Sequence, residues 1–408
     1  MRESLASLAK IHYGKSPNEV ILIDGAVPIV GTGGIYGRAD RAMFDEGIVV
    51  ARKGSLGKPH LFRTPFWPVD TTYAVVPLAG ISIEWLYYCL VDFDLTKLNE
   101  ATGVPSISRN WLSKIGIENP GAPQQKRIAA ILTSIDTAIE KTEALIAKYQ
   151  PIKAGLMHDL FTRGVLPNGQ LRPPREQAPE LYQETAIGWI PKGWSLTGLS
   201  AKGRQGTSWI RTGPFGSALK GEHWRVDGHP VITIGALGIG EFIPSELLFV
   251  GPKDATRLAD FQLKTGDVVF SRVADVGRSV VVREAQAGWI MSSNLMRIAV
   301  DPAQLRPDYL QMQLADDPRV KAQIRASVNS GGRDVANSEV LNRLRFVCPE
   351  PSEQDRVIST ANQLTERLNV EMSMVAKRQT QKLGLMQDLL TGKVQVKVHE
   401  RTPELLHA

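Results

Sequence analysis

The sequence predicts an α+β protein in which two α/β domains are joined by two long helices. Three observations lead to this prediction. The chain has 408 residues, more than one hydrophobic core usually holds together. A segment with helical periodicity occurs twice, displaced by 229 positions, so that Lys153 matches Lys382. The regions ahead of these segments repeat more faintly, displaced by 220 positions.

The first domain is predicted over residues 1–122. The apolar run Ile48-Val49-Val50 is typical of a buried strand, and a loop with glycine and basic residues follows it. Val268-Val269-Phe270 begins the same pattern further along the chain. In this second copy, Arg52, Gly57-Lys58 and Arg63 return as Arg272, Gly277-Arg278 and Arg283. We therefore expect two domains of one type whose loops have diverged.

The first long helix is predicted over residues 123–163. From Ile128 to Leu156, apolar residues recur at alternating steps of three and four, which places them along one helix face. Pro151 interrupts this pattern, and an interior proline costs about 3 kcal/mol, so we expect a kink or a break near Gln150. The end of the helix is repeated without gaps: Gly155-Leu156-Met157, Asp159-Leu160 and Thr162 return as Gly384-Leu385-Met386, Asp388-Leu389 and Thr391.

A linker is predicted over residues 164–184, because Arg172-Pro173-Pro174-Arg175 is too rich in proline for a helix or a central strand. The second domain then covers residues 185–350, the second long helix 351–393 and a C-terminal tail 394–408. Nothing ahead of Leu5 matches the start of the second domain. The first domain is therefore expected either to be shorter or to be completed by the tail.

The two long helices are expected to pair with each other. A single helix of this kind cannot cover its own apolar stripe, and two equivalent helices supply each other's missing surface. We infer an antiparallel coiled-coil pair that relates the two halves by a pseudo-two-fold axis. The second helix is more polar, with Glu371 and Arg378 in place of Thr142 and Tyr149. The alternative is that each helix packs only on its own domain.

Composition narrows the class of protein. Hydrophobic residues make up 43% and charged residues 22% of the chain, which is typical of folded globular domains. No run approaches the roughly 18 apolar residues of a membrane helix, and the first residues form no signal peptide, so we expect a cytoplasmic protein. The net charge of +6 favours a polyanionic partner. Cys89 and Cys348 are expected to be buried apolar side chains.

The sequence shows no complete catalytic or metal-binding motif. Gly14-Lys15-Ser16 ends like a phosphate-binding loop, but Ala9 stands where the first glycine is required. Gly31-Thr32-Gly33-Gly34 follows an apolar run, but Tyr36 replaces the last glycine of a dinucleotide-binding motif. The histidines and cysteines lack metal-ligand spacing. We expect no catalytic residue, metal or cofactor in this chain.

Basic residues mixed with amides and hydroxyls gather in the loops of both predicted domains. Arginine, lysine, asparagine and glutamine have the donor geometry that suits base edges, while serine and lysine commonly hold phosphates. We therefore expect these residues to contact DNA. The candidate DNA-binding residues are Arg38, Arg52, Lys53, Ser55, Lys58, Arg63 and Arg109 in the first domain, and Arg211, Lys220, Arg272, Arg278, Asn294 and Arg333 in the second.

Together these features resemble a known family, and the resemblance spans nearly the whole chain. Ile187-Gly188-Trp189-Ile190-Pro191-Lys192-Gly193-Trp194 looks like the start of a target-recognition domain in the specificity subunits of type I restriction-modification enzymes. Gly213-Pro214-Phe215-Gly216-Ser217 resembles a loop that follows it. Pro349, Glu353-Gln354, Arg356 and the run from Gly384 to Lys393 resemble the second conserved helical region of that family, and residues 123–163 resemble the first.

The resemblance implies a subunit without activity of its own. Each target-recognition domain would read one half of a bipartite, asymmetric site in double-stranded DNA. Two modification subunits would dock on the conserved helices and methylate adenine with S-adenosylmethionine, and restriction subunits that use ATP would join them. The residues expected at this subunit interface are Gln125, Arg127, Leu156, Met157, Leu160, Gln354, Arg356, Leu385, Met386 and Leu389.

Two other functions belong to different classes. A self-contained DNA methyltransferase would need a cofactor pocket within this chain. A coiled-coil scaffold would bind no DNA. A gel-shift assay with random competitor DNA would distinguish such a scaffold from a DNA-binding subunit.

Overall fold

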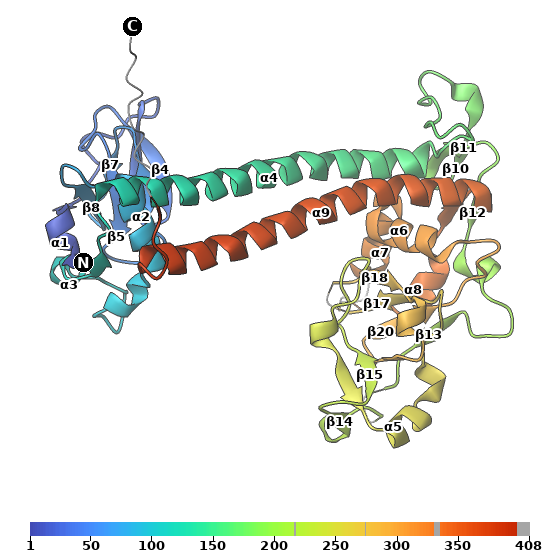
Figure 1. Ribbon diagram of the computed structural model, residues 1–408. Helices are drawn as coiled ribbons and strands as arrows, with labels where there is room; N and C mark the ends of the chain where they lie inside the picture. The colour runs from blue at the N-terminus through green and yellow to red at the C-terminus, as the bar shows by residue number, and fades with distance from the viewer. Residues whose placement is uncertain (216–217, 274, 330–334, 398–408) are drawn as a thin grey trace, which may run out of the picture. The chain divides into compact units, whose positions relative to one another are not determined.

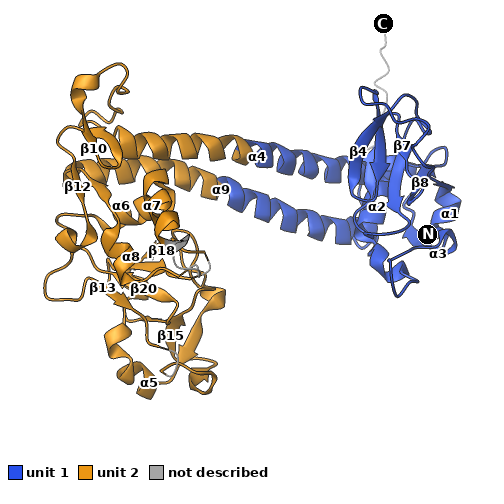
Figure 2. Cartoon of the chain, turned by 180° about the vertical axis from the view of Figure 1, so that it is seen from behind, with its two compact units in different colours: residues 1–145, 371–408 blue, residues 146–370 orange. Residues whose placement is uncertain are grey.

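The computed structural model describes residues 1–215, 218–273, 275–329 and 335–397. The chain divides into two compact units (Figure 2): unit 1 holds residues 1–145 and 371–408, and unit 2 holds residues 146–370. Each unit contains an α/β domain and parts of two long helices, α4 (Ala122–Thr162) and α9 (Pro351–Leu390). The predicted fold class is thereby confirmed.

The domain of unit 1 is built on two sheets. Strands β2 (Ala9–Tyr13), β8 (Thr72–Pro77), β5 (Gly47–Ala51) and β6 (His60–Phe62) form an antiparallel sheet in that order. In the second sheet, β3 (Val27–Gly31) lies between antiparallel β4 (Gly34–Ala39) and parallel β7 (Trp67–Pro68). Strand β1 (Arg2–Ser4) pairs with β9 (Gly116–Glu118). The predicted strand Ile48-Val49-Val50 is the buried part of β5.

Helix α2 (Ile83–Asp92) packs on the larger sheet of unit 1 (Figure 1). Its N-cap is Ser82, whose Oγ accepts a hydrogen bond from the Trp85 backbone N–H at 3.3 Å. Trp85 is fully buried in a core shared with Ile128 of α4 and Met386 of α9. The start of α4 and the end of α9 are therefore part of this domain's core. The short helices here are α1 (Leu5–Leu8), α3 (Arg109–Ser113) and the 3-10 helix η1 (Leu95–Leu98).

The domain of unit 2 also has two sheets. One has the order β13 (Ile210–Thr212), β20 (Leu295–Ile298), β17 (Val268–Ser271), β18 (Ser279–Val281). The other has the order β14 (Trp224–Arg225), β16 (Leu248–Val250), β15 (His229–Ile232), β19 (Ile290–Met291). Two strand pairs complete it, β10 (Tyr182–Thr185) with β11 (Gly188–Pro191), and β12 (Ser195–Thr197) with β21 (Phe346–Cys348).

The α-helices of this domain are α5 (Pro252–Arg257), α6 (Pro307–Asp316), α7 (Pro318–Asn329) and α8 (Ser338–Arg343). The 3-10 helices are η2 (Pro179–Leu181), η3 (Leu199–Lys202), η4 (Gly221–His223), η5 (Pro244–Glu246), η6 (Ala259–Phe261) and η7 (Glu284–Gln286).

The two domains share one topology. The order β2-β8-β5-β6 in unit 1 corresponds to β13-β20-β17-β18 in unit 2. In each domain the second sheet contains one parallel contact, β3 with β7 or β15 with β19. The run α2, α3, β9, α4 then corresponds to α6, α8, β21, α9, and α7 is an addition of unit 2. The duplication therefore covers whole domains, as the faint repeat predicted.

The long helices pack against each other within each unit. In unit 1, Lys382 Nζ lies 2.6 Å from Asp136 Oδ1, and Arg378 Nη1 donates to Ala138 O at 3.0 Å. This order of contacts makes the helices antiparallel, as predicted. In unit 2, Phe161 of α4 and Val357 of α9 share one core. Because α9 also packs on the first domain and α4 on the second, the alternative of separate helices is wrong.

Helix α4 continues through Pro151, so the predicted break near Gln150 is wrong. The proline removes one backbone donor, which leaves the carbonyl of Ala147 without its helical partner. Both residues are exposed, so water can hydrate that carbonyl group. The cost of the missing bond is thereby reduced.

The segment predicted as a linker is packed against unit 2. Tyr182 Oη donates to Pro173 O at 2.6 Å, Arg172 Nη1 donates to Arg163 O at 2.8 Å, and Val165 is buried. In unit 1, Val396 packs partly buried against the domain core. Residues after Thr391 therefore contribute to the first domain.

Candidate nucleic-acid interface

Matched loops lie at equivalent places in the two domains. The loop after β5 lies against the segment ahead of α3, where the Ile107 backbone N–H donates to Arg52 O at 2.9 Å. After β17, the Ala336 backbone N–H donates to Arg272 O at 2.7 Å in the same way. In both domains the structure thus places the loop that the sequence matched against the segment ahead of the next short helix.

Arg52 and Arg272 hold these loops in place. Arg52 Nη1 donates to Asp70 O at 2.9 Å, and Arg272 Nη1 donates to Ser293 O at 3.4 Å. Arg272 Nε also donates to Ala336 O at 3.2 Å. A guanidinium carries five N–H donors, so each arginine keeps donors for a further partner. Their first role is to fix the loop backbone.

An aromatic ring that the sequence did not single out lies between two candidate cations. Tyr13 is 47% exposed, and its ring lies 5.2 Å from the Arg52 guanidinium carbon and 5.8 Å from that of Arg109. The neighbouring Tyr73 donates its hydroxyl to Ile107 O at 3.0 Å, and burial raises its pKa. Tyr13 ends β2 without any motif around it, so only the fold reveals this cluster.

The remaining candidates of the first domain differ in availability. Lys53, Ser55 and Lys58 are exposed in the loop after β5, and the described residues give them no ion pair. Arg38 is exposed on β4. Arg63 is held at 2.8 Å by Glu84, which accepts a hydrogen bond from Ser82. The exposed lysines are therefore the readiest phosphate contacts in this domain.

In the second domain, Lys220 and Asn294 are exposed. Arg211 pairs with Asp260 at 3.0 Å and stacks 4.8 Å from the ring of Phe261. Arg333 lies outside the described residues.

The structure shows Arg278 in contacts within its own domain. Its Nη1 donates to Leu237 O at 2.9 Å, and its Nε lies 3.3 Å from Asp275 Oδ2. These bonds connect the turn after β17 to the segment after β15. Because its charge is paired and its donors face backbone carbonyls, Arg278 supports the loop rather than presenting a free cation.

The predicted subunit-interface residues are mostly internal. Gln125 and Gln354 are 1% and 0% exposed, and each Oε1 accepts the backbone N–H of a matched helix cap, Ser82 or Arg306. A buried, satisfied amide offers no group to a partner. Among the apolar candidates, Met157, Leu160, Met386 and Leu389 are buried in the domain cores, and Leu156 and Leu385 pack partly buried against them.

Two predicted interface cations remain accessible to different degrees. Arg127 is exposed on α4. Arg356 is partly buried and donates through Nε to Val165 O at 3.0 Å. Only Arg127 presents a side chain without such a contact.

Glu353 forms a cluster that the sequence did not predict. Its carboxylate, 7% exposed, accepts hydrogen bonds from Arg172 Nη2 at 2.8 Å, from Trp194 Nε1 at 3.1 Å and from the Val165 backbone N–H at 3.1 Å. The cluster attaches the Pro-rich segment to the start of α9. The signal in the sequence was the difference from the first copy, where Gln124 takes the place of Glu353.

The described residues contain no cluster of histidine, cysteine, aspartate or glutamate that could hold a metal ion. Both cysteines are buried, and burial raises the pKa of each thiol. Over the same part of the chain, no helix is long and apolar enough to cross a membrane.

Comparisons with known proteins agree with this arrangement. Residues 3–148 match the family model described as type I restriction modification DNA specificity domain. The MjaVIII type I restriction enzyme specificity subunit of Methanocaldococcus jannaschii is 21% identical over 319 residues, which cover 77% of this chain and 70% of that protein. The EcoprrI specificity subunit of Escherichia coli is 24% identical over 143 residues, which cover 33% of this chain and 36% of that protein.

The fold is similar to that of a solved structure over almost its full length. The crystal structure of the type I restriction-modification system S subunit from M. genitalium matches with a TM-score of 0.64 and 15% identity, covering 96% of both chains. With its duplicated domains, its antiparallel helices and the family match at residues 3–148, this chain is similar to the specificity subunits of type I restriction-modification systems.

Proposed function

We propose that this chain reads a bipartite, asymmetric site in double-stranded DNA, one half with each domain, and performs no chemistry itself. The observation that carries the proposal is the duplication of an entire domain with different side chains on equivalent loops. Lys53 follows Arg52 in the first copy, whereas Val273 follows Arg272 in the second. The same domain fold with different side chains on its loops supports the reading of two different half-sites.

Phosphate contacts supply attraction, and base contacts supply discrimination. The exposed Lys53 and Lys58 suit the first role. Arg109 at the start of α3 and Tyr13 at the end of β2 offer guanidinium donors and a planar apolar face for the second role. Arg52 and Arg272, which hydrogen-bond to the backbone of these loops, would hold the phosphate-contacting and base-contacting side chains in a fixed geometry.

The catalytic groups would come from partner subunits. In this proposal two modification subunits dock on the long helices and methylate adenine with S-adenosylmethionine, and restriction subunits supply ATP-dependent activity. This chain itself would need no cofactor. Exposed helix positions such as Arg127 are the groups available for docking.

Methylome sequencing tests the proposal directly. Cells that express the modification subunit with this chain should carry N6-methyladenine in a single split motif, and cells that express the modification subunit alone should not. A motif that persists without this chain, or the absence of any motif with it, would contradict the reading role. Calorimetry of the pure chain with S-adenosylmethionine should detect no tight binding.

A further inference from the structure

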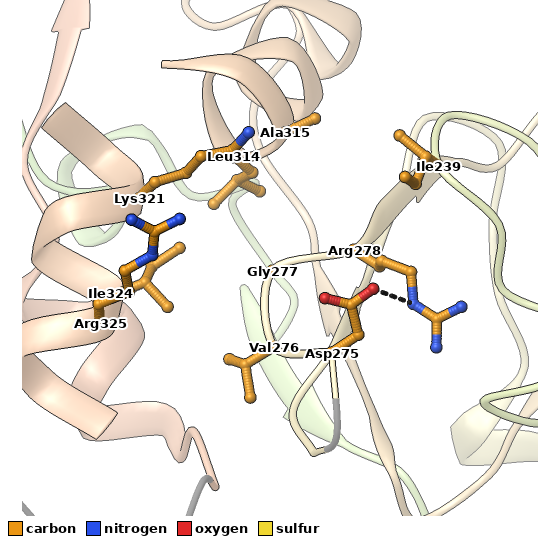
Figure 3. A pocket seen from close by; sticks show the side chains of 10 residues that line it. All are labelled: Ile239, Asp275, Val276, Gly277, Arg278, Leu314, Ala315, Lys321, Ile324 and Arg325. Carbon is orange, nitrogen blue, oxygen red and sulfur yellow. Dashed lines mark ion pairs between the residues drawn. The ribbon is translucent and has the colours of Figure 1, made fainter. Parts of the chain in front are cut away.

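A cavity of about 250 Å³ opens in unit 2 beside the turn between β17 and β18 (Figure 3). Lys321, Ile324 and Arg325 of α7 line one wall, and Leu314 of α6 extends it. The turn residues from Asp275 to Arg278 line the opposite wall. The cavity thus lies between the helix that unit 2 adds to the shared topology and a loop predicted to contact DNA.

Two cations of α7 face this cavity from one side. Lys321 and Arg325 are one helical turn apart, so their side chains project from the same face. Lys321 is partly buried and Arg325 is exposed. Within the described residues, neither takes part in an ion pair. Two neighbouring cations without a counter-ion repel each other, and an anion between them would remove that repulsion.

The opposite wall does not supply the missing anion. Asp275 is paired with Arg278, and the remaining donors of Arg278 are directed to the carbonyls of Leu237 and Ile234. The charges of this pair offset each other. The cavity therefore has a net positive side, formed by Lys321 and Arg325, and a neutral side.

The position of the cavity identifies the kind of anion. The turn begins three residues after Arg272, which holds the recognition loop of the second domain. DNA that reaches this loop would bring its backbone to α7. Lysine and arginine donors suit both phosphate oxygens and the acceptors of guanine. Only a phosphate carries the negative charge that would offset these two cations.

We propose that Lys321 and Arg325 form a seat for a backbone phosphate of the half-site bound by the second domain. The inference rests on the proposed function and adds a contact specific to the second domain, because α2 is followed by the four-residue 3-10 helix η1 rather than by an α-helix like α7. The second domain should therefore hold its DNA with a steeper salt dependence than its loops alone provide.

The test uses the full chain and a random-sequence DNA duplex. The double variant Lys321→Ala/Arg325→Ala should lower the slope of log affinity against log salt by about one unit. Between about 50 and 200 mM salt, the affinity of the wild type should then fall by a factor roughly four times larger than that of the variant. The conservative double variant Lys321→Arg/Arg325→Lys should behave like the wild type.

Lys192→Glu is the matched control, because it changes the net charge by the same amount at an exposed lysine after β11. It should leave the slope nearly unchanged. Thermal melting should show that all variants fold, since neither α7 cation has an ion pair to lose among the residues that the structure describes. An unchanged slope in the alanine double variant, or an equal change in the control, overturns the phosphate seat. A wild-type chain that binds no DNA would instead refute the proposed function.

Discussion

At the scale of single residues, two buried side-chain amides make equivalent hydrogen bonds in the two duplicated domains. Gln125 and Gln354 occupy matched positions, and each accepts a backbone N–H from the residue that caps the equivalent helix of its domain. Gln354 also donates to Gln304 O and Pro349 O at 3.0 and 2.9 Å. The amide therefore joins the start of α9 to the start of α6.

Replacing Gln354 with alanine should destabilise unit 2 without affecting partner recognition directly. The change leaves the buried carbonyl of Pro349 and the less buried Arg306 N–H and Gln304 carbonyl without their partner, at a cost of about 1 to 3 kcal/mol. Urea unfolding measures this loss. Gln363→Ala, at an exposed position of the same helix, should change stability by less than about 0.5 kcal/mol. Equal effects of the two variants would show that the buried amide is not structural.

Removing the Glu353 carboxylate should lower the free energy of unfolding more than removing any exposed acidic residue of α9. Glu353→Ala leaves the Arg172 guanidinium, which is 15% exposed, without its carboxylate partner. This should lower the free energy of unfolding by about 3 to 5 kcal/mol. Asp355→Ala breaks a pair with Arg306 near the same helix end, but that carboxylate is 52% exposed and the expected loss is at most about 1 kcal/mol. Comparable unfolding free energies for the two variants would contradict this ranking.

The sequence located these residues but not their roles. The repeat matched Arg52 with Arg272 and Gln125 with Gln354, and the structure confirms that these residues occupy equivalent positions in the two domains. Their partners are backbone carbonyls and N–H groups of segments distant in the sequence, and no sequence pattern predicts such contacts. The sequence therefore could not distinguish exposed lysines from arginines that hydrogen-bond to the backbone. The structure shows that Lys58 is of the first kind and Arg278 of the second.

At the scale of secondary-structure elements, a polar link connects α4, α9 and α2 in unit 1. Asp136 accepts a hydrogen bond from Tyr88 Oη at 2.8 Å and pairs with Lys382. Burial raises the pKa of Tyr88, so its hydroxyl stays protonated and donates. One turn away, Arg378 contacts both Ala138 O and Thr142 Oγ1. Directional bonds of this kind favour one register of the two helices.

Arg378→Ala should weaken the helix pair in unit 1 by about 1 to 2 kcal/mol, because two hydrogen bonds to a charged donor are lost. Thr142 keeps its own bond to Ala138 O at 2.9 Å, which limits the cost. Urea unfolding gives the comparison with Lys377→Ala, an exposed neighbour whose removal should have little effect. If both variants unfold alike, the bonds across the pair contribute nothing.

Helical periodicity was sufficient to predict both long helices and their antiparallel pairing. It could not predict that α4 would continue through Pro151, because that outcome depends on packing on both sides of the proline rather than on local preference. The strands were predicted only where apolar runs were continuous, as in β5. Short strands such as β7 and β19 are defined by their partners, so their sequences carry little signal.

At the scale of the whole molecule, each domain begins and ends at a paired strand. In unit 2, β12 pairs with β21, and Leu196 lies opposite Val347. In unit 1, β1 pairs with β9, and Glu3 lies opposite Ile117. The chain therefore enters and leaves each domain at neighbouring backbone positions. A domain built in this way can change its loops while its attachment to the long helices stays the same.

Exchange of residues 198–345 for the equivalent segment of a similar specificity subunit should change one half of the methylated motif and leave the other half intact. The exchange keeps β12 and β21, so the new domain is attached by the same strand pair, and Gln354 and Glu353 stay on α9. The loops of the first domain, including Lys53, Lys58 and Arg109, are untouched. Methylome sequencing of cells that express the chimera with the modification subunit measures both half-sites at once. The reciprocal exchange of residues 5–115 is the control and should alter the other half. A chimera that folds and methylates but changes both half-sites together would show that the domains do not read DNA independently.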